Sequence, residues 1–277
     1  MIEAVNLNAD LGEGFGAYSI GNDQAMLDIV KSANIACGFH GGDPLVIRRT
    51  VRLACNNQVS IGAHPSFPDL QGFGRRPMSL SDEELESIIG YQIGALIGIA
   101  KSVGGSVTHV KPHGALNNMA AVDLAIAKVV VRAVQDLDAG LILLAPARSR
   151  LVQAGREAGL TVAEEIFADR GYGEEGDLLP RSMPGSVHHD VQTCVDQIVA
   201  FLRAGAIITR SGKHIPTDIH SICVHGDSPM GVSVARTILE VLESNNIEVH
   251  PLPKILESAG RTTLQGGVRA TTAVGQS

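Results

Sequence analysis

The stretch Asn6-Leu7-Asn8-Ala9-Asp10-Leu11-Gly12-Glu13-Gly14 alternates polar and apolar residues and then stops at a turn of carboxylates and glycines. Seven times along the chain a short apolar run rich in β-branched residues ends in this way, and six of the seven ends carry ionisable side chains. The strand-like segments are 4–10, 33–37, 59–63, 107–111, 141–145, 161–166 and 221–225. They alternate with helical patterns at 23–31, 44–57, 81–103, 121–136, 147–158, 187–204 and 230–245. This order predicts an α/β fold, a distorted seven-stranded (β/α) TIM-like barrel whose strand ends meet on one face.

The chain of 277 residues has the length of a single α/β barrel. We expect one barrel domain over residues 1–255. One segment breaks the βα alternation, because residues 207–215 read as a small hairpin that turns at Ser211-Gly212. The composition shifts to Thr, Gly, Gln and Ser towards the end, which predicts a flexible tail over residues 256–277.

Composition narrows the range of partners. A net charge of −7 and an aromatic content of 3% with no tryptophan disfavour nucleic acid, which is bound through cations and stacking rings. No apolar run approaches the roughly 20 residues that span a bilayer, and the first residues do not resemble a signal peptide. Four separated cysteines without a C-x-x-C pair favour the reducing cytoplasm. A homo-oligomer is compatible with the sequence.

The first strand places polar side chains inside the predicted barrel. Asn6, Asn8 and Asp10 share one face of the strand, and that face points inward. Polar groups are costly there unless they contact a ligand, an ion or each other. We therefore expect Asn8, Asp10 and Glu13 in the site; the alternative is a loop of solvated carboxylates.

Two histidines follow the next two strands. His40 and His64 could join Asp10 in a divalent metal site made of one carboxylate and two imidazoles. Alternatively, these histidines serve as acid–base groups or ligand contacts without an ion.

The fourth strand ends at Lys111-Pro112-His113-Gly114. Lys111 is suited to a phosphate or a developing oxyanion, and His113 is suited to carry a proton. The alternative for Lys111 is a salt bridge to Asp10 or Glu165 inside the barrel.

Three further segments carry candidate groups. Arg75 and Arg76 lie in a tight basic loop suited to a carboxylate or phosphate, although surface arginines are the alternative. Asp169 and Arg170 begin a glycine-rich segment that we expect to cover the barrel mouth. The last strand ends at His225-Gly226-Asp227, a second carboxylate–imidazole pair at a helix start, where Asp227 could simply cap the helix.

Two common catalytic motifs are absent from the sequence. There is no G-x-x-x-x-G-K-[ST] phosphate loop, and there is no G-x-S-x-G nucleophile elbow. Serine hydrolysis is thus disfavoured.

Several long strings carry a family resemblance in collinear order. They are Asn-Ala-Asp-Leu-Gly-Glu-Gly-Phe-Gly (8–16), Ser-Ala-Asn-Ile-Ala-Cys-Gly-Phe-His-Gly-Gly-Asp-Pro (32–44), Ile-Gly-Ala-His-Pro (61–65), Asp-Leu-Gln-Gly-Phe-Gly-Arg-Arg (69–76), His-Val-Lys-Pro-His-Gly-Ala-Leu (109–116), Phe-Ala-Asp-Arg (167–170) and Cys-Val-His-Gly-Asp (223–227). Together they closely resemble the LamB/YcsF family. The resemblance runs from about residue 4 to residue 250 and departs from the usual pattern at Ser66 and Asn117.

The resemblance implies a seven-stranded barrel similar to the glycoside hydrolase/deacetylase barrels. It implies ring opening of 5-oxoproline (pyroglutamate) to L-glutamate with ATP as co-substrate, by the A subunit of a 5-oxoprolinase that also contains subunits B and C. On this basis Lys111 with Arg75 or Arg76 neutralises phosphate charge, Asp10 or His113 activates water, and Glu13, His40, His64 and Asp227 complete the pocket. Two other functions stay open: a metal-dependent amidohydrolase or deacetylase without ATP, and a non-catalytic subunit that binds oxoproline.

Overall fold

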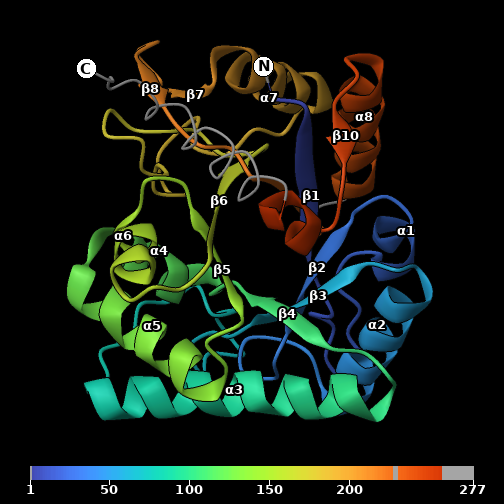
Figure 1. Ribbon diagram of the computed structural model, residues 1–277, viewed down its shortest axis with the longest axis vertical. Helices are drawn as coiled ribbons and strands as arrows, with labels where there is room; N and C mark the ends of the chain where they lie inside the picture. Colours follow the sequence, from blue (N-terminus) through green and yellow to red (C-terminus); the bar gives the residue numbers. More distant parts are fainter. Residues whose placement is uncertain (1, 227–229, 258–277) are drawn as a thin grey trace, which may run out of the picture.

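The computed structural model describes residues 2–226 and 230–257, and its centre is a closed barrel of parallel strands (Figure 1). The barrel strands are β1 (Ala4–Leu11), β2 (Ser32–Ala36), β3 (Ser60–His64), β4 (Val107–Val110), β5 (Ile142–Pro146), β6 (Val162–Phe167) and β9 (Ser221–His225). They pair in this order, and β9 pairs with β1 to close the ring. The predicted seven-stranded barrel is confirmed, and each predicted strand overlaps one of these seven.

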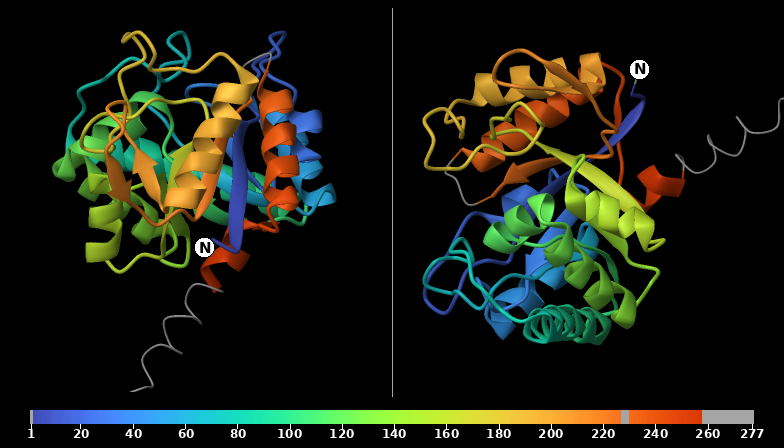
Figure 2. Two further views of the ribbon diagram at one scale, coloured as in Figure 1. Left: turned by 90° about the horizontal axis from the view of Figure 1, so that it is seen from above. Right: turned by 90° about the vertical axis from the view of Figure 1, so that its left-hand side faces the viewer.

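Helices surround the strands. They are α1 (Asp23–Leu27), α2 (Pro44–Asn56), α3 (Asp82–Ser102), α4 (Gly114–Val122), α5 (Leu124–Leu137), α6 (Arg150–Glu157), α7 (Val191–Ala204) and α8 (Gly231–Ser244). Figure 1 shows α3 on one side of the barrel and α7 and α8 on the opposite side. Figure 2 shows α7 and α8 next to each other, where they pack together. The predicted hairpin is present as β7 (Ala206–Ile208) and β8 (His214–Pro216), and β10 (Glu248–Val249) pairs with the start of β1.

Helix α4 differs from the prediction. The sequence pattern predicts a single helix over residues 121–136, whereas the chain forms α4 and α5 with a break at Asp123. The Asp123 carboxylate accepts a hydrogen bond from the Ala125 amide at 2.8 Å and caps α5. Helix α4 begins at Gly114, which has a φ of +59°. Because glycine at the end of an apolar run is typical of a turn, no sequence signal marked a helix start there.

The two faces of the strands have opposite character. Outward-facing residues such as Leu7, Ile35 and Ile222 pack against the helices in the main hydrophobic core. Most of the inward face is polar: Asn6, Asn8, Ser32, Asn34, Ser221 and His109 are all 0% exposed. Ile142 and Leu144 of β5 and Ala163 of β6 instead form a small apolar cluster with Leu252. The predicted polar stripe along the first strand is therefore one side of a polar barrel interior.

Among the described helices, none alone has both the length and the apolar composition needed to cross a membrane. Helices α4 and α5 meet those criteria only as a pair bent by 119°.

The predicted boundary after residue 255 stays a prediction. Leu256 still packs against a small apolar cluster that includes Leu252 and Ile142. The rest of the predicted tail, residues 258–277, lies outside the described residues.

Substitution of Ser81 tests how the N-terminus of α3 is stabilised. Its side chain and that of Glu84 form a capping box, with Ser81 N donating to Glu84 Oε2 at 2.8 Å. We expect Ser81→Ala to lower the free energy of unfolding by about 1 kcal/mol, measured by urea denaturation. Ser102→Ala, at the exposed other end of α3, is the control. Equal losses in the two variants would contradict the capping role.

Candidate functional site

A ladder of amides forms the floor of the site inside the barrel. Asn34 Nδ2 donates to Asn8 Oδ1 at 2.7 Å and to Asp10 Oδ1 at 2.9 Å. His109 Nε2 lies 3.0 Å from Asn34 Oδ1. A Cβ atom at Gly62 would collide with the His109 ring, which explains the glycine on the neighbouring strand. These bonds satisfy buried polar groups and orient Asp10 from below.

Lys111 lies above this floor and joins three strands through its ammonium group. Its Nζ is 2.9 Å from Asp10 Oδ1, 3.2 Å from Glu165 Oε2 and 3.1 Å from Cys223 Sγ. The Lys111 side chain is only 2% exposed. The salt bridges that the sequence left open as the alternative for Lys111 are therefore both present.

The charges of this buried group follow from its contacts. Burial disfavours the charged forms, but the carboxylates of Asp10 and Glu165 and the Cys223 thiol raise the pKa of Lys111 well above its usual value. Burial likewise opposes ionisation of Asp10, but His64 and Lys111 hold the pKa of Asp10 well below its usual value. For Glu165, burial prevails over Lys111 and raises the pKa. Lys111 and Asp10 thus form an ion pair beside a carboxyl that is more readily protonated.

Three histidines and one glutamate form a second buried group, here called the histidine cluster: Glu13, His40, His64 and His113. His40 Nε2 lies 3.1 Å from Glu13 Oε1, and His64 Nε2 lies 3.0 Å from His113 Nδ1. The rings of His40 and His113 stack with centroids 3.8 Å apart. One ligand atom from each of the four residues lies within 4.8 Å of the others, so the cluster could hold a metal ion.

Burial and neighbouring imidazoles keep part of the cluster uncharged. Desolvation, followed by the charge of His64, holds the pKa of His40 well below its usual value. Desolvation and the two other imidazoles do the same to the pKa of His113. Neutral imidazoles at neutral pH are the form that accepts a proton or binds a metal.

A turn after β3 forms a roof over the histidine cluster. The Phe73 carbonyl oxygen lies 2.9 Å from His113 Nε2. A Cβ atom on Gly74 would lie 2.8 Å from the Cβ of His40 and 2.9 Å from His113 Cδ2, and Gly74 has a φ of +63°. Glycine is required there because of this positive φ and because a Cβ would collide with Ser66 Oγ and crowd the His40 and His113 side chains.

The two arginines of this turn have different partners. Arg76 forms an ion pair with the buried carboxylate of Asp69, with Arg76 Nε donating to Asp69 Oδ1 at 2.9 Å. The guanidinium of Arg75 lies over the Phe73 ring, 5.0 Å from its centroid. Arg76 therefore holds the turn together, and Arg75 lies at the roof of the cluster.

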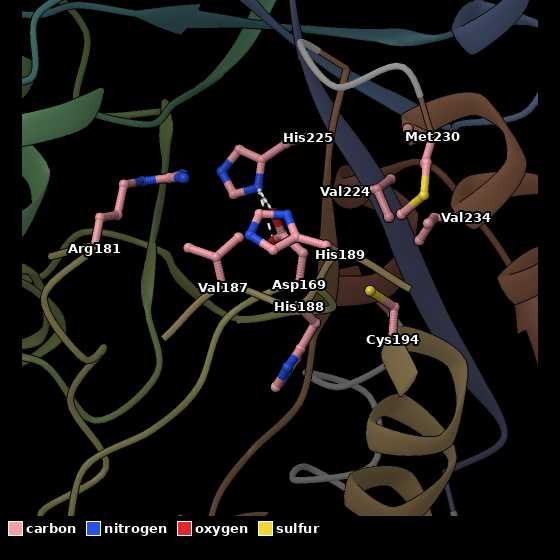
Figure 3. Close-up of a pocket in the computed structure, with 11 residues that line it drawn as sticks. Asp169, Arg181, Val187, His188, His189, Cys194, Val224, His225, Met230 and Val234 are labelled. Carbon is pink, nitrogen blue, oxygen red and sulfur yellow. Dashed lines mark hydrogen bonds and ion pairs between the residues drawn. The ribbon is translucent and has the colours of Figure 1, made fainter. Parts of the chain in front are cut away.

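A pocket of about 400 Å³ opens beside the barrel mouth between the starts of α7 and α8 (Figure 3). The polar lining groups shown there include Asp169, Arg181, His188, His189 and His225. His225 Nδ1 lies 2.8 Å from both carboxylate oxygens of Asp169. His225 also offers a ring nitrogen within 4.8 Å of an Asp10 carboxylate oxygen. The imidazole thus stands between the pocket and the charged centre of the barrel.

The contact between His225 and Asp169 favours the charged form of each group. Burial opposes ionisation of both groups, but the Asp169 carboxylate raises the pKa of His225 above its usual value. In turn His225 holds the pKa of Asp169 at about 2 against the effect of burial. A partly exposed imidazolium at a pocket wall is suited to donate a proton.

Comparison with known proteins identifies the family. The model of the LamB/YcsF family matches residues 5–257. The chain belongs to the LamB/YcsF family. It is 54% identical over 253 residues to a protein of Azoarcus sp. (strain BH72) that is named as the A subunit of 5-oxoprolinase, covering 91% of this chain and 99% of the relative. A Gluconobacter oxydans protein of the same name is 51% identical over 250 residues, covering 90% and 98% of the two chains.

Solved structures agree with this assignment. The lactam utilization protein of Thermus thermophilus has a TM-score of 0.84 and 42% identity, covering 89% of this chain and 99% of that chain. The catalytic domain of a peptidoglycan N-acetylglucosamine deacetylase from Eubacterium rectale has a TM-score of 0.51 and 10% identity, covering 91% and 89%. The second likeness concerns the fold alone and agrees with the expected deacetylase-like barrel.

In this LamB/YcsF family member most predicted site residues lie together at the carboxyl ends of the strands. The residues brought together are Asn8, Asp10, Glu13, His40, His64, Lys111, His113, Glu165, Asp169 and His225. Arg170 instead points into the covering segment, where its Nη2 donates to the Leu179 carbonyl at 2.5 Å and its Nε to the Ser186 carbonyl. Asp227 lies outside the described residues.

Three further residues belong to the buried site and are not among the predicted ones: Asn34, His109 and Cys223. Asn34 contacts Asp10, Cys223 contacts Lys111, and His109 contacts Asn34. Asn34 and Cys223 lie beside Asp10 and Asn8 in the strand pairing. The alternation that selected Asn8 and Asp10 would have selected them too if it had been applied to the neighbouring strands.

Substitution of Lys111 tests the buried ion pair. Lys111→Met removes the ammonium and leaves the Asp10 carboxylate buried without its cation. We expect a loss of about 3–5 kcal/mol in the free energy of unfolding, measured by urea denaturation. Lys128→Met is the matched control, because Lys128 is half exposed and lies 4.0 Å from the exposed Glu157. A loss no larger than that of the control would contradict the structural role of Lys111.

The pair of His225 and Asp169 predicts a window of pH-dependent stability. Asp169 has a lowered pKa, so its contribution is present above the unfolded value of about 3.9 and is lost as the pH falls towards about 2. His225 has a raised pKa, so its contribution is present below the unfolded value of about 6.5 and is lost as the pH rises through the folded value. Asp169→Asn should therefore be most destabilising between about pH 4 and pH 6.5.

This window is measured from thermal unfolding of the wild-type and variant chains across the pH range. Asp196→Asn, on the exposed face of α7, is the control and should produce no such window. A destabilisation by Asp169→Asn that is constant with pH would show that the ion pair does not contribute.

Proposed function

We propose that this chain is the A subunit of an ATP-dependent 5-oxoprolinase, which opens 5-oxoproline to L-glutamate with ADP and phosphate as co-products. The observation that carries the proposal is the 54% identity to the Azoarcus protein named as the A subunit of 5-oxoprolinase, which is matched over 99% of its length. The Thermus relative is named a lactam utilization protein, and 5-oxoproline is a lactam.

The chemistry requires activation of a stable ring amide. Transfer of the γ-phosphoryl group of ATP to the lactam oxygen makes the ring carbon electrophilic and releases ADP. Water then adds to that carbon, the C–N bond breaks as the nitrogen takes a proton, and a γ-glutamyl phosphate results. A second water molecule releases phosphate and leaves L-glutamate, so two waters are consumed for each ring and each ATP.

We assign the proton donor for the leaving nitrogen to His225. Its ring lies at the wall of the pocket, and the Asp169 carboxylate orients it and favours its protonated form. Asp10, within 4.8 Å of His225, provides the negative charge that orients the attacking water. Lys111 contacts Asp10 from within the barrel and acts as a positioning residue, since its Nζ is already engaged by buried partners.

We further propose that subunits B and C complete the enzyme and that the complex acts in the cytoplasm. The relatives are named as one lettered subunit of an enzyme, which supports a multi-subunit assembly. Four cysteines that are free thiols, of which Cys37, Cys194 and Cys223 are buried, suit a reducing compartment. Arg75, at the roof beside Phe73, is the cation that we assign to phosphate.

A second candidate function is a metal-dependent amidohydrolase that acts without ATP. The histidine cluster favours it, because three imidazoles and a carboxylate form a common ligand set for a catalytic metal. Here the metal would polarise the amide carbonyl in place of phosphorylation.

The proposal is tested by glutamate release from 5-oxoproline with the purified chain, with and without subunits B and C. We expect release only with ATP and with both partners. Glutamate release by this chain alone without ATP, abolished by chelation, would contradict the proposal and establish the second candidate.

Substitution of His225 tests its role in the reconstituted enzyme. We expect His225→Gln to lower kcat by roughly 100- to 10,000-fold, which is the range for loss of a general acid. His214→Gln, in the exposed strand β8, is the control and should retain the wild-type rate. A His225→Gln enzyme with a near-normal kcat would remove His225 from the mechanism.

A further inference from the structure

The hydrogen bonds of His64 fix which of its nitrogens carries a proton. Its Nδ1 lies 2.6 Å from the Lys111 carbonyl oxygen, which can only accept. Nδ1 must therefore donate, and in the neutral ring Nε2 presents a lone pair. That lone pair faces Asp10 Oδ2 at 3.3 Å and His113 Nδ1 at 3.0 Å.

The same reasoning fixes His113. Its Nε2 lies 2.9 Å from the Phe73 carbonyl oxygen and must donate to it. The Nδ1 of a neutral His113 ring then presents a lone pair to His64 Nε2. Two neutral imidazoles that face each other with lone pairs at 3.0 Å repel each other, and the Asp10 carboxylate adds a third acceptor. A cation at this point removes the repulsion, and it is either a proton shared by the two rings and Asp10 or a metal ion.

We propose that the histidine cluster binds one divalent transition-metal ion through His64 Nε2, His113 Nδ1, His40 Nε2 and Glu13 Oε1. The neighbouring ligand atoms are 3.0 to 3.6 Å apart along the path from His64 through His113 and Glu13 to His40. Ligands bound to one ion at about 2.1 Å, with angles of about 90 to 110°, lie at about 3.0 to 3.4 Å from each other. These three separations are close to those of a coordination shell. The His40 and His113 rings, stacked at 6° with centroids 3.8 Å apart, must turn relative to each other to direct both nitrogens at one ion.

The ligand chemistry selects the class of ion. Three imidazoles and one carboxylate suit Zn²⁺, Co²⁺ and related first-row ions, whereas Mg²⁺ and Ca²⁺ prefer all-oxygen sites. The carbonyl oxygens of Lys111 and Phe73 hold the outer nitrogens of two ligand rings, which is the usual arrangement around metal-bound histidines. His40 is the third ligand ring. Its outer nitrogen, Nδ1, is buried and has no hydrogen-bond partner among the described residues.

The site differs from the one expected from the sequence. Asp10, expected as a ligand with His40 and His64, is engaged by Lys111 and lies beside the ion as a neighbouring carboxylate. Glu13 and His113 take its place. The roof formed by Phe73 and Gly74 covers the cluster, so we expect the ion to exchange slowly.

The proposal is tested by metal binding, independently of any enzymatic activity. The full chain is treated with a chelator, and Zn²⁺ and Co²⁺ are then titrated separately by calorimetry and by visible absorption. We expect one equivalent of either ion, with Co²⁺ giving the absorption of a site with nitrogen and oxygen ligands. Glu13→Gln and His113→Gln should each weaken Zn²⁺ binding by at least about 100-fold. His214→Gln, which removes an exposed histidine, should bind as the wild type does.

Two results would overturn the proposal. Binding that is unchanged in Glu13→Gln and His40→Gln would indicate an adventitious ion only. An absence of stoichiometric binding, together with ¹⁵N spectra in which His64 and His113 share a proton, would mean that a proton occupies the position assigned to the metal. Circular dichroism verifies that each variant is folded; if His113→Gln does not fold, the near-isosteric Glu13→Gln decides the outcome.

Discussion

The ammonium group of Lys111, buried between Asp10 and Glu165, is the interaction on which the organisation of the barrel depends. A charge in the axis of a barrel is unfavourable unless opposite charge and hydrogen bonds surround it. The strands supply both, because β1 carries Asp10, β6 carries Glu165, and the amides of Asn8 and Asn34 bond the same groups. The polar groups of the interior thus form a connected network, and the main apolar core lies outside the strands.

This network separates two chemical environments at the mouth. On one side the histidine cluster is closed by the turn that contains Phe73 and Gly74. On the other side His225 and Asp169 line an open pocket. Asp10 touches both, since it lies 3.3 Å from His64 Nε2 and within 4.8 Å of His225. A molecule in the pocket therefore contacts the pair of His225 and Asp169, and Asp10 lies behind that pair.

The sequence was sufficient to predict the barrel and most of the buried site. Period-two alternation placed Asn8 and Asp10 inside, and the parallel arrangement brought His64, Lys111 and Glu165 to the same end. The sequence did not show which groups the arginine side chains would contact. For Arg76 the sequence left open an anionic ligand or a surface position. The structure shows an ion pair with Asp69, formed in a turn whose geometry has no periodic sequence signal. Arg170 was expected among the groups at the barrel mouth. Its guanidinium instead donates hydrogen bonds to the carbonyl groups of Leu179 and Ser186, and such backbone contacts have no sequence signature.

We propose that the barrel mouth beside Asp10 and His225 binds the lactam, and a crystal structure of the assembled complex with 5-oxoproline would show whether it does. We expect density for the ring in the pocket lined by His225 and Asp169, with the ring nitrogen facing the imidazole. Density for the ring only at another place, such as the groove beside Arg148 and Arg156, would rule out this binding site.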